Sequence, residues 1–201
     1  ANLPIPTCNT IRSEYLEING AWDYNECQSS ASSVPMKPPI SPDEASRLAA
    51  VRQYYVLNNP PEAALDRITT LAARLFSVPV ACITLIDQHR LWFKSAYGLE
   101  LREMPREIAI CDHTIRSGDT MVVTNTENDP RFRESPLVTG PPGIRFYAGA
   151  PLTTPDGLHI GTLCIIDTVS RPGLSPDQEQ LLRGLADTVM DELELRLATV
   201  S

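Results

Sequence analysis

Basic residues and long apolar runs are both scarce in this 201-residue sequence. The chain has 17 Lys and Arg against 25 Asp and Glu, which gives a formal net charge of −8. Because an acidic chain repels nucleic-acid phosphates and anionic membrane surfaces, we expect neither as a partner. The longest apolar run extends from Val78 to Ile86 and is far shorter than the ~18–20 residues that cross a bilayer. The sequence therefore predicts no transmembrane helix.

Signals for export and for cysteine-based frameworks are also lacking. No basic stretch precedes an apolar stretch at the start of the sequence, so we expect no secretory leader. The five cysteines are odd in number and too scattered for a C-x-x-C zinc knuckle or a dense disulfide framework. His89 and His159 are expected on the surface with no second ligand at a workable spacing, so no metal site is predicted. A reducing cytoplasm is the expected setting.

The first 42 residues differ in composition from the rest and are predicted to form an arm and linker before one domain at residues 43–201. They hold six of the 18 prolines, and the stretch Gln28–Pro39 offers almost no apolar surface to bury. The segment Glu14–Tyr24, between Cys8 and Cys27, has enough aromatic and aliphatic surface to dock on a partner or on its own domain. A disordered leader is the alternative.

Three copies of one helix-start signal frame the predicted domain. Ser41 is placed to cap a helix, with Pro42 at the first helical position and Glu44 three residues after the cap. The signal returns at Asn59 and at Ser175, and apolar residues at helical spacing follow each copy. The sequence thus predicts two helices before the central region and one after it.

Between these helices the pattern changes to that of strands. Val80–Asp87 and Leu91–Gly98 are predicted to form one hairpin, and Phe146–Leu152 and Ile160–Ile166 a second one around a Pro-Asp-Gly turn. Thr120–Thr124 is predicted to be a fifth, short strand. Helices first, then hairpins, then a helix favour an α+β fold with an antiparallel sheet over a doubly wound parallel one.

A proline-rich loop at residues 125–145 separates the short strand from the second hairpin. Loops of this length in a compact domain are usually functional. Prolines at four positions stiffen it, and Gly140 and Gly143 offer hinges. We expect this loop to act as a lid over a binding site.

Five motifs follow one another along this domain: WFK at Trp92–Lys94, ICDHTI at Ile110–Ile115, DPRF at Asp129–Phe132, RFYAGAPL at Arg145–Leu152 and GTLCIID at Gly161–Asp167. Together they resemble the GAF domain family, in particular the subgroup found in bacterial sensor histidine kinases and diguanylate cyclases. The resemblance covers about Ala45 to Leu197. It implies a central antiparallel sheet of five or six strands, with the terminal helices on one face and a small-molecule pocket under loops and a short helix on the other.

The resemblance also implies a set of candidate ligand-binding residues, which are Phe93, Cys111, His113, Asp129, Arg145 and Tyr147. Simpler roles remain open for them. Trp92 and Phe93 alternate along a strand, so one faces the pocket side and the other the helix side, and both can be core residues. Asp129 can cap the following turn, and Arg145 can pair with a loop carboxylate.

The pair Cys111 and His113 is central to one alternative. In GAF photoreceptors a Cys followed closely by a His on the pocket helix attaches a bilin. In a helix, positions i and i+2 point about 200° apart, so these two side chains cannot form a nucleophile–base dyad unless the segment is extended. No Lys or Arg flanks Cys111, which is therefore expected to be mostly thiol. Cys82 and Cys164, inside predicted strands, are expected to be core residues.

Three functions follow from the resemblance. The leading hypothesis is a non-catalytic sensory or regulatory module of a cytoplasmic signalling protein, such as a two-component system, that binds a small ligand or relays conformation to an output domain elsewhere. It needs no cofactor, and no common catalytic motif is present. One alternative is a photoreceptor that holds a bilin cofactor on Cys111 or Cys8. The other is an enzyme that resembles free methionine sulfoxide reductase.

Charge and surplus apolar residues give two further expectations. Arg131, Arg133 and Arg145 are local cations, which favours an anionic or carbonyl-bearing ligand. The last helix carries more apolar residues than one sheet face can cover, so we expect a homodimer through helices at residues 41–57 and 175–199. The apolar residues of that helix are Leu181, Leu182, Leu185, Val189, Met190, Leu193, Leu195 and Leu197.

Overall fold

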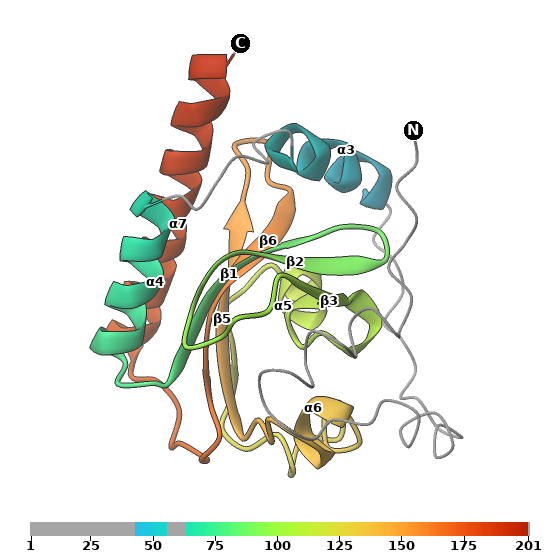
Figure 1. The fold of residues 1–201 in the computed structure, drawn as a ribbon, viewed down its shortest axis with the longest axis vertical. Helices are drawn as coiled ribbons and strands as arrows, with labels where there is room; N and C mark the ends of the chain where they lie inside the picture. Colours follow the sequence, from blue (N-terminus) through green and yellow to red (C-terminus); the bar gives the residue numbers. More distant parts are fainter. Residues whose placement is uncertain (1–42, 56–62, 201) are drawn as a thin grey trace.

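A six-stranded antiparallel sheet forms the centre of the protein (Figure 1). The structure is a computed structural model that describes residues 43–55 and 63–200. The strand order is β3-β2-β1-β6-β5-β4, and each neighbouring pair runs antiparallel. The strands are β1 (Val80–Ile86), β2 (Arg90–Tyr97), β3 (Glu103–Pro105), β4 (Met121–Val123), β5 (Phe146–Thr153) and β6 (His159–Asp167).

The middle strands, β1 and β6, are apolar on both faces because other elements cover the sheet on both sides. Every residue of β1 after Val80 is buried. The two strands also approach each other closely at Gly161. A Cβ atom at that position would lie 1.8 Å from the carbonyl oxygen of Thr84, so glycine is required there.

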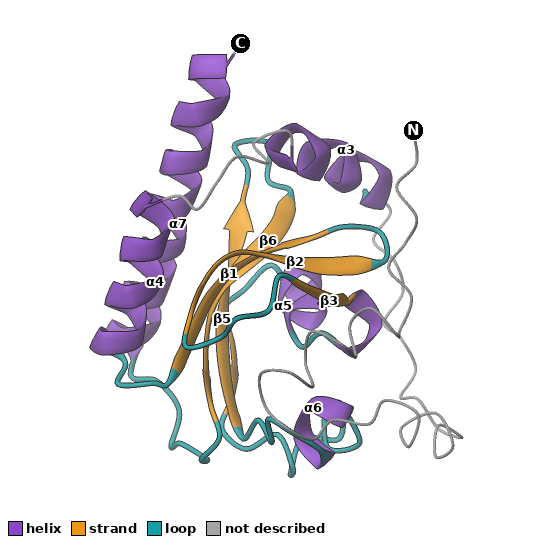
Figure 2. Ribbon diagram, viewed as in Figure 1, coloured by secondary structure: helices purple, strands orange, loops and turns teal. Residues whose placement is uncertain are grey.

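Two helices cover one face of the sheet (Figure 2). They are α4 (Ala63–Leu75) and α7 (Pro176–Val200), which pack on β1, β2, β5 and β6 and on each other. The core on this side includes Leu65 of α4, Phe146 of β5 and Leu182 of α7, all fully buried. Burying such side chains contributes roughly 1.5–3 kcal/mol each, so this layer is a major source of the stability of the domain.

Shorter elements cover the opposite face. These are a 3₁₀ turn, η1 (Arg106–Ile108), and two short helices, α5 (Cys111–Ser117) and α6 (Pro136–Thr139), together with the loop around α6. Tyr147 is the neighbour of Phe146 in β5 and faces this side, as the alternation of a strand requires. The helix α5 ends at Gly118, which has φ +73 and donates its backbone N–H to the carbonyl of Thr114.

A separate helix, α3 (Glu44–Tyr55), lies across one end of the sheet (Figure 1). Arg47 of α3 donates a 2.6 Å hydrogen bond to the carbonyl of Ile86, at the end of β1. Near the other end of α3, the hydroxyl of Tyr54 donates to the carboxylate of Glu194 in α7. The first described helix is therefore joined both to the sheet and to the last helix.

The structure confirms the α+β fold, both hairpins and the short strand that the sequence predicts. The capping box at Ser175 is also present: its Oγ accepts from the N–H of Gln178 at 3.2 Å, and its own N–H donates to the Gln178 side chain at 2.9 Å. The sequence did not predict β3, η1 or α6. The arm at residues 1–42 and the start signals at Ser41 and Asn59 lie outside the described residues. No helix in the described ranges is long and apolar enough to span a membrane.

Candidate functional site

A cavity of about 320 Å³ lies on the sheet face opposite α4 and α7. Its floor comes from strands β1, β2, β5 and β6, and one wall comes from α5 and the residues just before it. A second wall is the segment between β2 and β3, and the roof is the loop that contains α6. The lining is mainly apolar: Val80, Leu91, Phe93, Tyr147, Cys164 and Ile166 on the floor, Ala109, Ile110 and Cys111 on the first wall, and Gly98, Leu99, Leu101 and Met104 on the second.

The roof is the long loop that the sequence predicts to be a lid. Leu137, Pro141, Pro142 and Ile144 line the cavity from above. The loop folds back on itself, since the N–H of Ile144 donates to the carbonyl of Leu137 at 2.8 Å. Thr126 fixes the same turn through a 2.6 Å bond from its hydroxyl to the carbonyl of Ile144. The loop therefore covers a cavity, and its conformation is held by internal hydrogen bonds.

The polar atoms on the floor are buried and paired with each other. The hydroxyl oxygens of Tyr147 and Thr114 are 2.9 Å apart, and the Sγ atoms of Cys111 and Cys164 are 3.9 Å apart. Cys82, the cross-strand partner of Cys164, is also a buried free thiol. The contact with Cys164 and complete burial raise the pKa of Cys111 well above its ordinary value. Cys111 is consequently a neutral thiol near pH 7, which agrees with the expectation from the sequence.

The structure brings three of the six candidate residues together and places three elsewhere. Phe93, Cys111 and Tyr147 line the cavity. His113 points away from it, edge-on to Phe132 with ring centroids 4.8 Å apart. Burial lowers the pKa of His113 below its ordinary value. The opposite directions of Cys111 and His113 follow from their i, i+2 spacing in a helix.

Asp129 and Arg145 hold the loop instead of lining the cavity. Asp129 accepts a bond from the backbone N–H of Arg131 at 2.9 Å and pairs with its guanidinium at 2.6 Å. The side-chain bond from Arg131 lowers the pKa of Asp129. Arg145 pairs with Glu127 at 2.9 Å and donates to the carbonyl of Val138 at 2.9 Å. These contacts are the turn-capping and pairing roles that the sequence left open.

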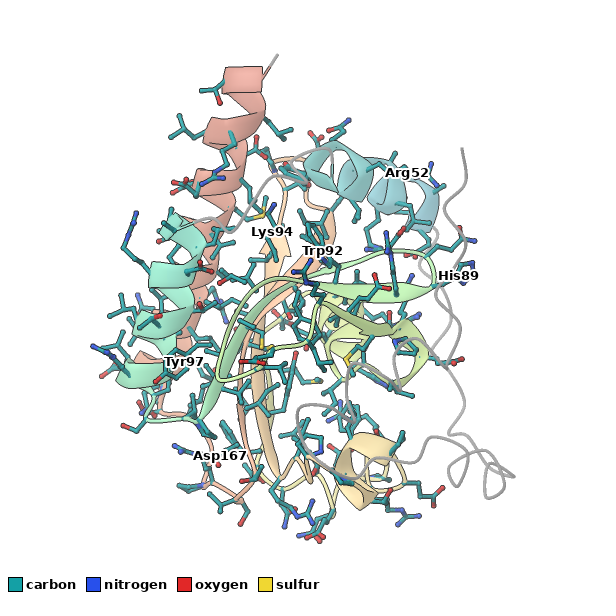
Figure 3. All side chains as sticks on the ribbon, viewed as in Figure 1. Arg52, His89, Trp92, Lys94, Tyr97 and Asp167 are labelled. Carbon is teal, nitrogen blue, oxygen red and sulfur yellow. The ribbon has the colours of Figure 1, made fainter. Side chains whose placement is uncertain are left out.

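Several other residues singled out in the sequence lie outside the cavity, and His89, Trp92 and Lys94 are labelled in Figure 3. His89 lies in the exposed turn between β1 and β2, as expected. Trp92 faces the helix side, where the Lys94 ammonium lies 5.1 Å from its ring centroid, so Phe93 is the member of the pair that faces the cavity. His159 is partly exposed, with Nδ1 3.0 Å from the Thr153 hydroxyl, so it reaches the surface on one side as expected. No metal-binding cluster of three or more acidic, His or Cys side chains occurs among the described residues.

The second wall is the main feature that sequence reasoning missed. Leu99 and Leu101 alternate with the exposed residues Glu100 and Arg102, which is the pattern of an extended segment with one apolar face. The alternation stops there, because Met104 on β3 also lines the cavity but lies three residues after Leu101. This pattern was the available signal, but it does not show which part of the molecule the apolar face covers.

A buried ion network behind the first wall was also not predicted. Nε of Arg106 donates to Oδ1 of Asp112 at 2.6 Å, and another nitrogen of Arg106 donates to Glu44 at 2.6 Å. Arg116 pairs with the other Asp112 oxygen at 2.7 Å. Burial alone would raise the pKa of Glu44, but hydrogen bonds from Arg47 and Arg106 outweigh it and lower the pKa to about 2. The network joins the cavity wall to α3.

A second depression, of about 460 Å³, lies on the outer surface of α4. All of its lining residues belong to that one helix, between Ala63 and Arg74. Within residues 43–55 and 63–200, no other element lines it. The cavity under the loop, which several elements surround, is therefore the better candidate for a small-molecule site.

Comparison with known proteins gives consistent results. A model of the GAF domain family matches residues 60–193. Cyclic di-GMP phosphodiesterase PA2567 of Pseudomonas aeruginosa is 38% identical over 162 residues, which are 81% of this chain and 28% of that protein. The chain thus spans little more than a quarter of the length of this curated relative.

Solved structures share the fold at low identity. The GAF domain of a phosphoenolpyruvate-protein phosphotransferase from Coxiella burnetii has a TM-score of 0.58 and 14% identity, with 77% of this chain and 96% of that chain covered. Free methionine-R-sulfoxide reductase of Neisseria meningitidis, solved with its substrate, has a TM-score of 0.55 and 18% identity, with 81% and 96% covered. At these identities the likeness concerns the fold alone.

Proposed function

The chain belongs to the GAF domain family, and we propose that it is a non-catalytic sensory and regulatory module that binds a small ligand in the cavity under the loop. The observation that carries the proposal is the cavity itself, which has a mainly apolar lining from the sheet, from the residues around the start of α5 and from the loop that contains α6. The 38% identity to part of a cyclic di-GMP phosphodiesterase supports a place in a larger protein of cyclic di-GMP signalling. Its output domain then lies outside this chain.

A chain of polar contacts supports a regulatory role, because it leads from the cavity wall to the last helix. Cys111 lines the cavity, and the next residue, Asp112, binds Arg106. Arg106 binds Glu44 in α3, whose far end binds α7 through the Tyr54–Glu194 hydrogen bond. A shift of α5 on ligand binding would change the position of α3 and, through it, of α7.

The reductase alternative depends on a reactive thiolate. The raised pKa of Cys111, caused by Cys164 and by burial, argues against that chemistry at neutral pH. Turnover of free methionine sulfoxide is the direct assay, and we expect none. Turnover that is lost in Cys111→Ala would replace the sensory proposal with an enzymatic one.

The size of the cavity argues against the bilin alternative. An engineered cavity of about 150 Å³ holds one benzene ring, so about 320 Å³ is small for a linear chromophore of four rings. We expect the purified protein to lack visible absorption. A visible band that persists on denaturation, as a thioether-linked bilin requires, would favour the photoreceptor instead.

The test of the proposal is a thermal-shift screen against a metabolite panel with cavity-filling variants. Ala109→Met and Leu101→Trp each add volume to a different wall, and Ala63→Met is the matched control on the exposed start of α4. We expect at least one compound to raise the Tm of the wild type and of the control, but not of either filled variant. A screen without any response, or a response kept by both filled variants, contradicts the proposal.

A further inference from the structure

We propose that the cavity selects a neutral, largely apolar ligand of about two rings and excludes anions such as nucleotides. The inference rests on the proposed function, because it specifies the ligand of the same cavity. The chemistry of the lining, the position of the nearby cations and the volume all favour such a ligand.

The lining offers no positive charge. None of the described residues that line the cavity is a lysine, an arginine or a histidine. The one acidic residue in the lining, Asp167, already accepts a 2.7 Å bond from Nε of Arg171 and a 3.2 Å bond from the N–H of Val169. The Tyr147 hydroxyl is engaged by Thr114. The polar groups at the cavity are thus largely satisfied before any ligand enters.

The loop arginines, which suggested an anionic ligand at the level of sequence, are used elsewhere. Arg131 pairs with Asp129 and its guanidinium lies 4.8 Å from the ring centroid of Phe132. Arg145 pairs with Glu127 and with loop carbonyls, as described above. None of these arginines lines the cavity, nor does Arg133. The positions of the arginines therefore do not support an anion in this cavity.

The start of α5 gives no anion site either. The N–H of Asp112 donates to the carbonyl of Ala109 at 3.2 Å, and that of His113 donates to the carbonyl of Ile110 at 3.0 Å. The Asp112 carboxylate carries a negative charge in this same first turn. An anion placed here would meet paired amides, and the two arginines beside Asp112 are already engaged by that carboxylate, so neither hydrogen bonds nor charge would hold it.

Burial energetics then decide the ligand class. A charged group that leaves water without a partner loses several kcal/mol of hydration, and this cavity supplies no counter-charge. Apolar surface gains roughly 25 cal/mol for each Å² that it removes from water. The volume of about 320 Å³ is roughly twice that of a cavity that holds benzene. Two fused or linked rings, or an apolar chain of the same volume, match both requirements.

A matched pair of fluorescent probes tests this inference. 1-Aminonaphthalene is neutral at pH 7, and 5-aminonaphthalene-1-sulfonate has the same two rings with an added sulfonate. Both are titrated into the full chain, into Ala109→Met and Leu101→Trp, and into the control Ala63→Met. We expect the neutral probe to bind wild type and control at one site, and to bind the filled variants at least roughly tenfold more weakly. The sulfonate should bind that site at least roughly tenfold more weakly than the neutral probe, because its charge would lack a partner.

The possible failures are distinguishable from each other. If the sulfonate binds the cavity as tightly as the neutral probe, and filling removes that binding, the ligand class is wrong while the sensory proposal stands. If the filled variants keep both unfolding cooperativity and full affinity for the neutral probe, the site is not this cavity and the inference fails. If neither probe binds and the metabolite screen is also negative, both proposals fail.

Discussion

Arg106 and Asp112 form an ion pair with 2.6 Å between Nε and Oδ1, and their side chains are only 7% and 6% exposed. Such a pair is costly to break, because removing one partner leaves the other charged and out of water. The same arginine also holds Glu44 of α3. Arg106 therefore holds both the cavity wall, through Asp112, and α3, through Glu44.

Replacement of Arg106 by Met should destabilise the fold by about 3–5 kcal/mol, since Asp112 and Glu44 both lose a buried partner. Urea unfolding measures the change. The control is Arg90→Met, which removes a partly exposed pair with Glu103 and should cost about 1 kcal/mol or less. An equal loss of unfolding free energy in the two variants would show that the buried network stabilises the fold no more than a partly exposed ion pair does.

The pH dependence of stability should carry the signature of Glu44. Its pKa is lowered from 4.5 to about 2 in the folded state, so its contribution is present above pH 4.5 and is lost as the pH falls toward 2. Glu44→Gln should flatten the loss of stability in that window. Identical acid-unfolding profiles for the variant and the wild type would contradict the assignment.

The buried thiols should react slowly. Cys82, Cys111 and Cys164 are free and buried, and the raised pKa of Cys111 keeps it protonated. Peptide mapping after a brief treatment with a mild thiol reagent should find Cys111 unmodified until the protein unfolds. Cys111→Ala should keep the fold at a cost of about 1 kcal/mol. Rapid, stoichiometric labelling of Cys111 would instead indicate a reactive site.

Association through the terminal helices remains a prediction. Leu182, Val189, Met190 and Leu193 of α7 are buried against the domain, but Leu195 is 62% exposed, which leaves apolar surface for a partner helix. Sedimentation velocity should show a dimer, and Leu195→Glu should shift it toward monomer. A monomer mass independent of concentration would defeat this prediction.

Local signals explain most of what could be predicted from the sequence. The capping box is formed by Ser175 and Gln178, which lie three residues apart and bond to each other, so local sequence is enough to predict it. The opposite directions of Trp92 and Phe93 likewise follow from the geometry of one strand. The strand β3 has three residues and depends on pairing with β2 for its existence. Propensity alone could not reveal it.

The site was harder to predict, because residue types do not show their partners. Arg145 was a reasonable ligand contact until the structure placed Glu127 and the Val138 carbonyl around it. Glu44 is 62 residues away from Arg106 in the sequence, and only the fold brings it to Arg106 and Asp112. The family motifs predicted where the cavity lies. Which charged side chains stay out of its lining depends on long-range contacts, which the motifs do not show.

The helix α3 has few of the contacts that hold the other layers in place. Among its described side chains only Arg47, Val51 and Tyr54 are buried. Segments with so little buried surface open locally at a lower free-energy cost than the sheet, so the amides of α3 should exchange with deuterium before those of β1. The docked and undocked forms of α3 would then be a natural equilibrium of this domain. Any molecule that tightens the wall carrying Asp112 would favour the docked form. Ligand binding in the cavity would then lower the fraction of time in which α3 is undocked.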